Sequence, residues 1–110
     1  MGRCPLKTIV MSDKAISVDP YVLTSLMSDL VGHDRSASSY VLYLALWQLA
    51  GASPRKAVTI SLRDLAACTG LSKSAVQRAV SHLRRRGLIS TAQENPTSPP
   101  KYTVQSPWLR

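Results

Sequence analysis

Apolar residues near the start of the chain recur with the period of an α-helix. Four of them lie at positions i, i+3, i+4 and i+7 and would form one stripe: Leu23, Leu26, Met27 and Leu30. Asp19 suits the N-cap of such a helix, and Pro20 suits its first helical position. The pattern therefore predicts a helix that begins after Asp19 and ends near Gly32.

A second helix is predicted from Ser36 or Ser38, either of which can cap it, to about Ala50. Its apolar residues surround the helix on nearly every side: Leu42, Leu44, Leu46, Trp47 and Leu49. The strongly apolar part, residues 40–50, is shorter than the roughly 20 residues that a membrane span needs. We therefore expect a buried central helix, and because the sequence has no Phe, an aliphatic core.

Two further helices are marked by their caps. Ser61 suits the N-cap of a helix that ends at Gly70, and residues 57–60 before it resemble a short strand. Ser72 suits the N-cap of a longer helix that ends at Arg86, with Gly87 as the terminating residue. The short connection between these two helices predicts a helix-turn-helix motif.

The last part of the chain predicts a β-hairpin. Residues 88–93 and 101–105 each read as a strand, and the proline-rich residues 94–100 between them cannot extend a helix. The predicted fold is mostly α with a small β-hairpin wing, a winged helix-turn-helix with an N-terminal helical extension. We expect residues 1–35 to form an N-terminal arm and helix, and residues 36–110 to form the winged helix-turn-helix domain.

The positive charge is confined to one half of the chain. Residues 1–53 contain four basic and four acidic residues, whereas residues 54–110 contain ten basic and two acidic residues, which accounts for the whole net charge of +8. Clustered positive charge repels itself and is most useful where the phosphates of a partner neutralise it. The second half is therefore predicted to face a polyanion.

The predicted helix over residues 72–86 has two different faces. Its apolar residues share one arc: Ala75, Val76, Ala79, Val80 and Leu83. The opposite arc carries Ser74, Arg78, Ser81 and Arg85, with Gln77 and His82 at its edges. Arginine can donate two hydrogen bonds to guanine and glutamine can pair with adenine, while serine and lysine can hold the backbone. The helix has five basic residues and no acid, so its polar face is suited to DNA.

The pattern DLAACTGLSKSAVQRAVSHLRRRGLI, residues 64–89, resembles the winged helix-turn-helix regulators of the GntR and MarR type, and related domains of phage and plasmid replication proteins. The resemblance implies a recognition helix in the major groove of DNA, with contacts from Lys73, Ser74, Gln77, Arg78 and Ser81, and a phosphate contact from Arg85. Ser72, His82 and Lys101 complete the expected set of DNA-binding residues. The hairpin tip departs from the family pattern, because it has Glu94 and no basic residue before Lys101. The wing could therefore contact DNA, or it could only pack against the domain.

These features predict a small, dimeric transcriptional regulator, a repressor, that binds specific double-stranded DNA in the cytoplasm. The stripe of the N-terminal helix could form the seam of a homodimer or cover the domain's own core. Two alternatives stay open: a plasmid or phage replication-initiation or partition protein, and a winged helix that binds another protein.

No residue pattern predicts an enzyme, a cofactor, a metal site or a small-molecule ligand. His33 and His82 are the only histidines, and Cys4 and Cys68 form no CxxC pair, so neither zinc nor a disulfide framework is expected. We expect Cys68 to be buried rather than a redox switch. Trp108 is expected to pack back on the domain rather than stack on a base.

Overall fold

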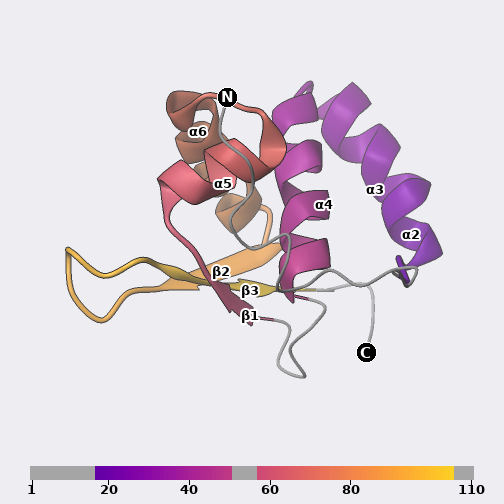
Figure 1. The fold of residues 1–110 in the computed structure, drawn as a ribbon. Coiled ribbons are helices and arrows are strands. Elements are labelled where there is room, and N and C mark those ends of the chain that lie inside the picture. The colour runs from indigo at the N-terminus through magenta and orange to yellow at the C-terminus, as the bar shows by residue number, and fades with distance from the viewer. Residues whose placement is uncertain (1–16, 51–56, 106–110) are drawn as a thin grey trace.

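The computed structural model describes residues 17–50 and 57–105. It is mostly helical with a small antiparallel sheet, as the sequence predicts (Figure 1). The elements in chain order are α2 (Pro20–Leu23), α3 (Ser25–Met27), the π-helix η1 (Ser28–His33), α4 (Ala37–Ala50), β1 (Ala57–Thr59), α5 (Leu62–Thr69), α6 (Lys73–Arg85), β2 (Ile89–Ala92) and β3 (Lys101–Val104).

The N-terminal helix begins as predicted, but it is not continuous. Asp19 accepts a hydrogen bond from the backbone N–H of Tyr21 at 2.9 Å, and Pro20 occupies the first turn. The helix then breaks at Thr24, whose backbone leaves the helical region (φ −117°, ψ −89°). The Thr24 hydroxyl donates to the carbonyl of Pro20 at 2.9 Å, a local bond that competes with regular helix geometry. The expected single helix is therefore three short pieces, ending at His33 in a π-helix.

This break changes which apolar residues are buried. Leu26 and Leu30 lie in the core together with Val22. Leu23 and Met27 are 50% and 40% exposed, so half of the predicted stripe points to solvent. A helical wheel assumes a constant 100° per residue, and both the break and the π-turn violate that assumption.

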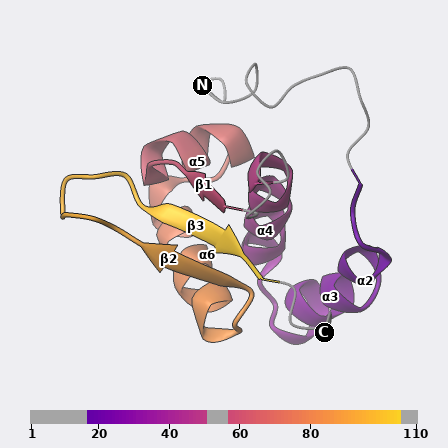
Figure 2. The ribbon, with the colours of Figure 1, turned by 90° about the horizontal axis from the view of Figure 1, so that it is seen from below.

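Helix α4 is the central helix, as predicted. It lies between the N-terminal helices and α5 in two perpendicular views (Figures 1 and 2), and it contacts η1, α5, α6, β1 and β3. Leu42, Leu46 and Leu49 are buried, while Leu44 and Trp47 are partly buried against the same core. α4 thus supports the helix-turn-helix motif on one side and the N-terminal extension on the other.

The core is mostly aliphatic, as expected, but it also contains three tyrosines. Tyr43 and Tyr102 are the largest fully buried side chains of the described residues, and Tyr40 is buried too. The Tyr40 hydroxyl donates to the carbonyl of Val22 at 2.8 Å, and the Tyr43 hydroxyl donates to that of Gln105 at 2.7 Å. These hydrogen bonds offset the cost of removing the two phenol hydroxyls from water. Burial raises the pKa of Tyr40 and of Tyr102.

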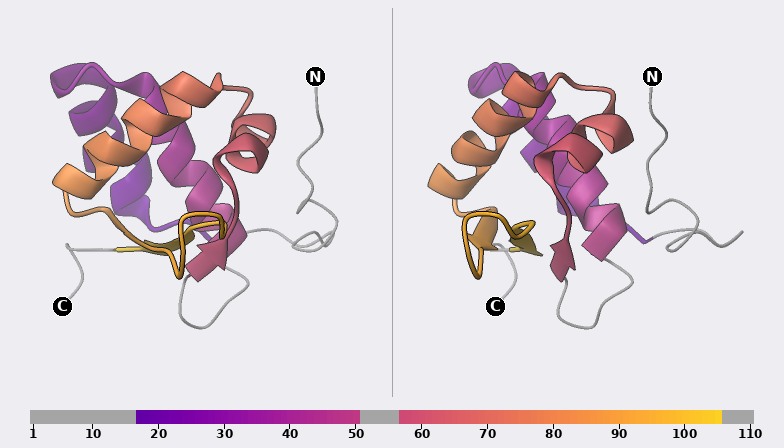
Figure 3. Two further views of the ribbon diagram at one scale, coloured as in Figure 1. Left: turned by 90° about the vertical axis from the view of Figure 1, so that its left-hand side faces the viewer. Right: turned by 60° about the vertical axis from the view of Figure 1, so that its left-hand side comes forward.

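The predicted hairpin is present, and β1 joins it. The strand order is β1-β3-β2, with both neighbours antiparallel to β3. Val58 pairs with Tyr102, and Thr91 pairs with Tyr102 from the other side. The hairpin loop projects on the same side of the molecule as α6 (Figure 3). The sheet therefore anchors the wing beside the helix-turn-helix motif.

Some predictions concern residues outside the described ranges, namely Cys4 and Trp108. Cys68 is disulfide-bonded, so the expectation of a chain without disulfides is wrong. Cys68 is partly buried against the core. None of the helices in residues 17–50 and 57–105 combines the length and the apolar character that crossing a membrane requires.

Candidate nucleic-acid interface

The caps that define the helix-turn-helix motif form as predicted. The Ser61 hydroxyl accepts a hydrogen bond from the N–H of Asp64 at 3.1 Å, and the Ser72 hydroxyl accepts one from that of Ala75, also at 3.1 Å. Gly70 ends α5 with φ of 78°, a left-handed conformation that glycine adopts without a steric penalty. These local bonds fix where α5 stops and where α6 starts.

Helix α6 separates its two faces as the sequence predicts. Val76, Ala79, Val80 and Leu83 are buried, and Ala75 is half-buried. The predicted contact residues on the other face are exposed: Ser72, Lys73, Ser74, Gln77, Arg78, Ser81 and Arg85. Packing of the apolar face on α4 thus leaves a continuous polar surface on α6.

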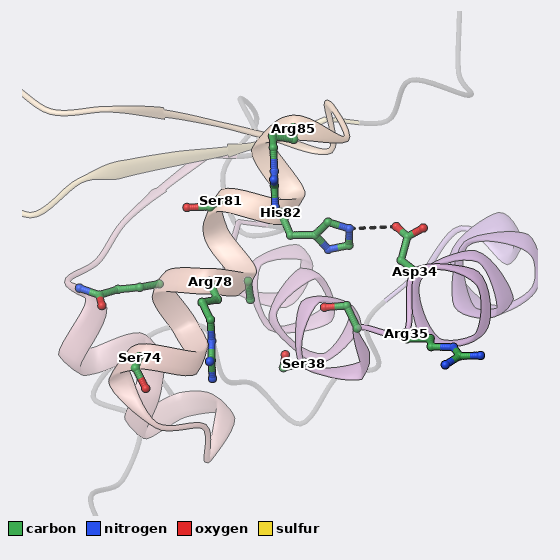
Figure 4. A pocket seen from close by; sticks show the side chains of 11 residues that line it. Asp34, Arg35, Ser38, Ser74, Arg78, Ser81, His82 and Arg85 are labelled. Atoms are coloured by element: carbon green, nitrogen blue, oxygen red, sulfur yellow. Dashed lines mark ion pairs between the residues drawn. The ribbon is translucent and has the colours of Figure 1, made fainter.

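A hollow lies between α6 and the start of α4 (Figure 4). Six of the predicted residues line it from α6: Ser74, Gln77, Arg78, Ser81, His82 and Arg85. Its other wall includes Arg35, Ser36 and Ser38. Sequence reasoning missed this second wall, because only the fold brings residues near position 35 beside a helix that starts at Lys73.

Lys73 and Lys101 lie in other hollows. Lys73 lines a depression with Arg63 and with the wing residues Thr97 and Ser98. Lys101 lines a separate one with Glu94 at the base of the wing. The predicted residues therefore form a main surface on α6 and a second, wing-side surface.

The wing loop is ordered by its own hydrogen bonds. The Asn95 side-chain oxygen accepts from both the N–H and the hydroxyl of Thr97, at 3.1 and 2.8 Å. The Gln93 amide donates to the carbonyl of Ser98 across the loop. The side-chain oxygen of Asn95 thus holds the conformation of the tip, which has no basic side chain.

His82 lies at the inner edge of the hollow, where both of its ring nitrogens meet protein groups. Its Nδ1 lies 2.8 Å from the hydroxyl of Ser39, and its Nε2 lies 2.9 Å from Oδ2 of Asp34. Arg86 Nε lies 3.2 Å from the same oxygen, and its guanidinium also pairs with Asp29. Asp34 Oδ2 is therefore within ion-pair distance of both His82 and Arg86, but it accepts a hydrogen bond from neither of them. We call these residues, Asp29, Asp34, His82 and Arg86, the inner-edge cluster.

Asp34 is the centre of this cluster. Its side chain is only 11% exposed, and its Oδ1 lies 3.0 Å from His33 Nδ1. The hydrogen bond with His33, and then the charges of Arg86 and His82, lower the pKa of the Asp34 carboxyl, although burial opposes this shift. Asp34 is therefore held as a carboxylate that links η1 to α6.

Asp29, His33 and Asp34 each offer a ligand atom within 4.8 Å of the others, a spacing that a metal ion can use. Both carboxylates already pair with Arg86, whose positive charge opposes a bound cation. These side chains therefore form an ion-pair network that joins the η1 region to the end of α6.

Comparison with protein families identifies this architecture. The model of the MarR family matches residues 43–97, half of the chain, from within α4 through the helix-turn-helix motif to the wing loop. The match includes every predicted contact residue except Lys101. Comparisons with curated proteins and with solved structures found no match. The chain therefore belongs to the MarR family, and it is a winged helix-turn-helix, DNA-binding transcriptional regulator.

Proposed function

We propose that the protein is a homodimeric repressor that binds specific double-stranded DNA with α6 in the major groove. The observation that carries the proposal is the outer arc of α6, which we define as Ser74, Gln77, Arg78, Ser81 and Arg85. Among the described residues, no carboxylate lies within ion-pair distance of Arg78 or Arg85. Exposed cations without partners are poised to meet phosphates and base edges.

Each residue of the interface suits a particular contact. Gln77 and Arg78 reach base edges, where an amide matches adenine and a guanidinium matches guanine. Arg85, Lys73 and Lys101 hold phosphates, and the serines, including Ser72, add backbone hydrogen bonds. His82 acts by fixing α6 rather than by contact with DNA, because its ring is engaged with Ser39 and Asp34.

Dimerisation through the N-terminal element fits the exposed apolar residues of that region. Leu23, Met27 and Val31 are 40 to 50% exposed, and Val41 of α4 is 40% exposed. A second copy that covered them would present two recognition helices to half-sites about 34 Å apart. In this proposal residues 1–35 serve dimerisation, residues 36–110 bind DNA, and the protein acts in the cytoplasm.

One experiment tests the DNA-binding part. Duplexes bound by the protein are selected from a random library at two salt concentrations, and affinities for the selected and for a scrambled duplex are then measured. We expect a two-fold symmetric site. Gln77→Ala and Arg78→Ala should weaken specific binding by about 1 to 3 kcal/mol and relax sequence preference, whereas Arg85→Ala should weaken all duplexes alike.

The matched control is Gln48→Ala, because Gln48 is exposed on α4 and does not line the hollow. Equal losses on selected and scrambled duplexes for all three α6 variants would contradict the recognition-helix assignment.

The dimer is tested by light scattering. Leu23→Glu places a charge on the exposed apolar surface, and we expect it to convert a dimer to a monomer and to abolish binding to symmetric sites. Gln48→Glu is the control with the same added charge, and it should leave the dimer intact. A wild-type protein that is monomeric on its selected site would overturn this part.

Repression is tested with a reporter that carries the selected site downstream of its promoter.

A further inference from the structure

Arg35 has an unusual backbone conformation. It links η1 to α4 with φ of 52°, and it is the one non-glycine residue with positive φ in the described part of the chain. This conformation disfavours a residue with a β-carbon, and it persists only where the surroundings impose it. The turn brings the chain out of η1 and into α4, and it leaves the Arg35 side chain exposed.

The surroundings of Arg35 tie it to α6. The preceding residue, Asp34, pairs with His82 of α6 and with Arg86, the C-cap residue of that helix. The N–H of Ser36, the following residue, donates to the carbonyl of Leu30 at 2.8 Å. Arg35 is thus flanked by two anchored residues, and its position relative to α6 is set before any partner binds.

Arg35 lies across the hollow from Arg78 and Arg85 (Figure 4). Its side chain is directed away from α6 in that view. The only acidic side chain in the wall is Asp34, whose charge is engaged by the inner-edge cluster. No carboxylate of the described residues lies within ion-pair distance of Arg35. The hollow is therefore a positive surface built from two elements.

We infer that Arg35 contacts a backbone phosphate of the DNA strand that borders the major groove occupied by α6. This inference rests on the proposed function. An α-helix fills the major groove, which is about 12 Å wide. A cation on the segment next to that helix, across the hollow, therefore meets the sugar-phosphate backbone at the edge of the groove. Because the Arg35 side chain extends away from α6, it is placed for this wall and not for the base edges that α6 reads. Arg35 therefore adds affinity and register without adding sequence preference.

Arg35→Asn tests the inference, because asparagine lacks the charge and tolerates positive φ. We expect binding to weaken about 3- to 10-fold at 0.1 M salt, equally on the selected and the scrambled duplex. The slope of log affinity against log salt should fall by about 0.9. Arg35→Lys keeps the charge and should therefore retain most of the affinity and most of the salt slope. Gln48→Glu makes the same change in net charge at a site outside the hollow, and it should leave the slope unchanged.

The outcomes separate this inference from the proposed function. If Arg35→Asn leaves affinity and slope unchanged while Arg78→Ala and Arg85→Ala reduce affinity, the phosphate contact is wrong and the α6 interface stands. If Arg35→Asn reduces binding only to the selected duplex, Arg35 reads bases and the inference is overturned. If none of the three variants changes binding, the proposed α6 interface itself fails. Thermal unfolding of each variant checks that all are folded.

Discussion

The two edges of α6 carry the same kinds of side chain into different surroundings. On the outer arc, Arg78 and Arg85 are exposed, with no carboxylate of the described residues in reach. On the inner edge, His82 and Arg86 lie against Asp34, which belongs to the N-terminal region. Neighbours from a distant part of the sequence thus divide one basic helix into an exposed surface, which we propose binds DNA, and an attachment to the rest of the fold.

This difference separates stability from binding. Changes in the inner-edge cluster should alter the free energy of unfolding, whereas changes on the outer arc should alter DNA affinity alone.

Asp34→Asn should reduce the free energy of unfolding by about 1 to 3 kcal/mol, because an ion pair at a mostly buried carboxylate lies between an exposed pair and a fully buried one. The substitution leaves His82 and Arg86 beside a neutral amide in a site where Asp34 was 11% exposed. Urea denaturation measures the change. The control is Glu94→Gln, which removes a carboxylate from the exposed wing tip. Equal stability of the two variants would show that the inner-edge cluster does not hold α6.

The same carboxylate should make stability depend on pH in the acid range. The folded-state pKa of Asp34 is lowered below 3.8, so the unfolded chain takes up the proton more readily. The stabilisation is fully present above the unfolded pKa of about 3.9, and it is lost as the pH falls through the folded value. His33, His82 and Arg86 are the charged or titratable partners around it. Unfolding followed between pH 6 and pH 2 should show a steeper loss for the wild type than for Asp34→Asn, and parallel curves would refute this.

Arg86→Gln should reduce the free energy of unfolding by no more than about 1 kcal/mol, because its side chain is 38% exposed and solvent screens its ion pairs. The adjacent Arg85→Gln is the matched control, since it removes the same charge one residue away. Urea denaturation at low and at high salt compares them. A loss that is equal for both variants, or that does not shrink at high salt, would argue against a role for the Asp29 and Asp34 pairs.

Arg78→Ala and Arg85→Gln should change the free energy of unfolding by less than about 0.5 kcal/mol, as exposed substitutions usually do. Their effect should appear in DNA titrations instead. Either variant that unfolds as readily as Asp34→Asn would place the outer arc in the fold as well as in the interface.

Local chemistry explains why the helix-turn-helix motif is predictable from sequence. The N-caps Ser61 and Ser72 bond to backbone groups three residues away, and Gly70 and Gly87 adopt the left-handed turns that end their helices. Each of these signals lies within a few residues of the structure it specifies. The apolar arc of α6 then follows from regular helix geometry, which holds over its whole length.

The N-terminal region departs from its prediction for two reasons, a local break in the helix and long-range bonds of buried side chains. The expected stripe fails where Thr24 bonds to the carbonyl of Pro20 and where η1 adopts π-helical geometry. Two of the buried tyrosines, Tyr40 and Tyr43, depend on carbonyls 18 and 62 positions away along the chain, which the sequence pattern does not reveal. A phenol becomes a core residue only when folding supplies such a partner.

Three features follow from the amino-acid sequence alone: the helix-turn-helix motif, the exposed basic arc of α6 and the confinement of positive charge to the second half of the chain. These depend on caps, periodicity and composition, which act over a few residues. Two others require the folded chain: the attachment of α6 to Asp34 through His82 and Arg86, and the place of Arg35 across the hollow from Arg78. Ion pairs and shared surfaces join residues more than 40 positions apart, and their distances exist only once the chain has folded.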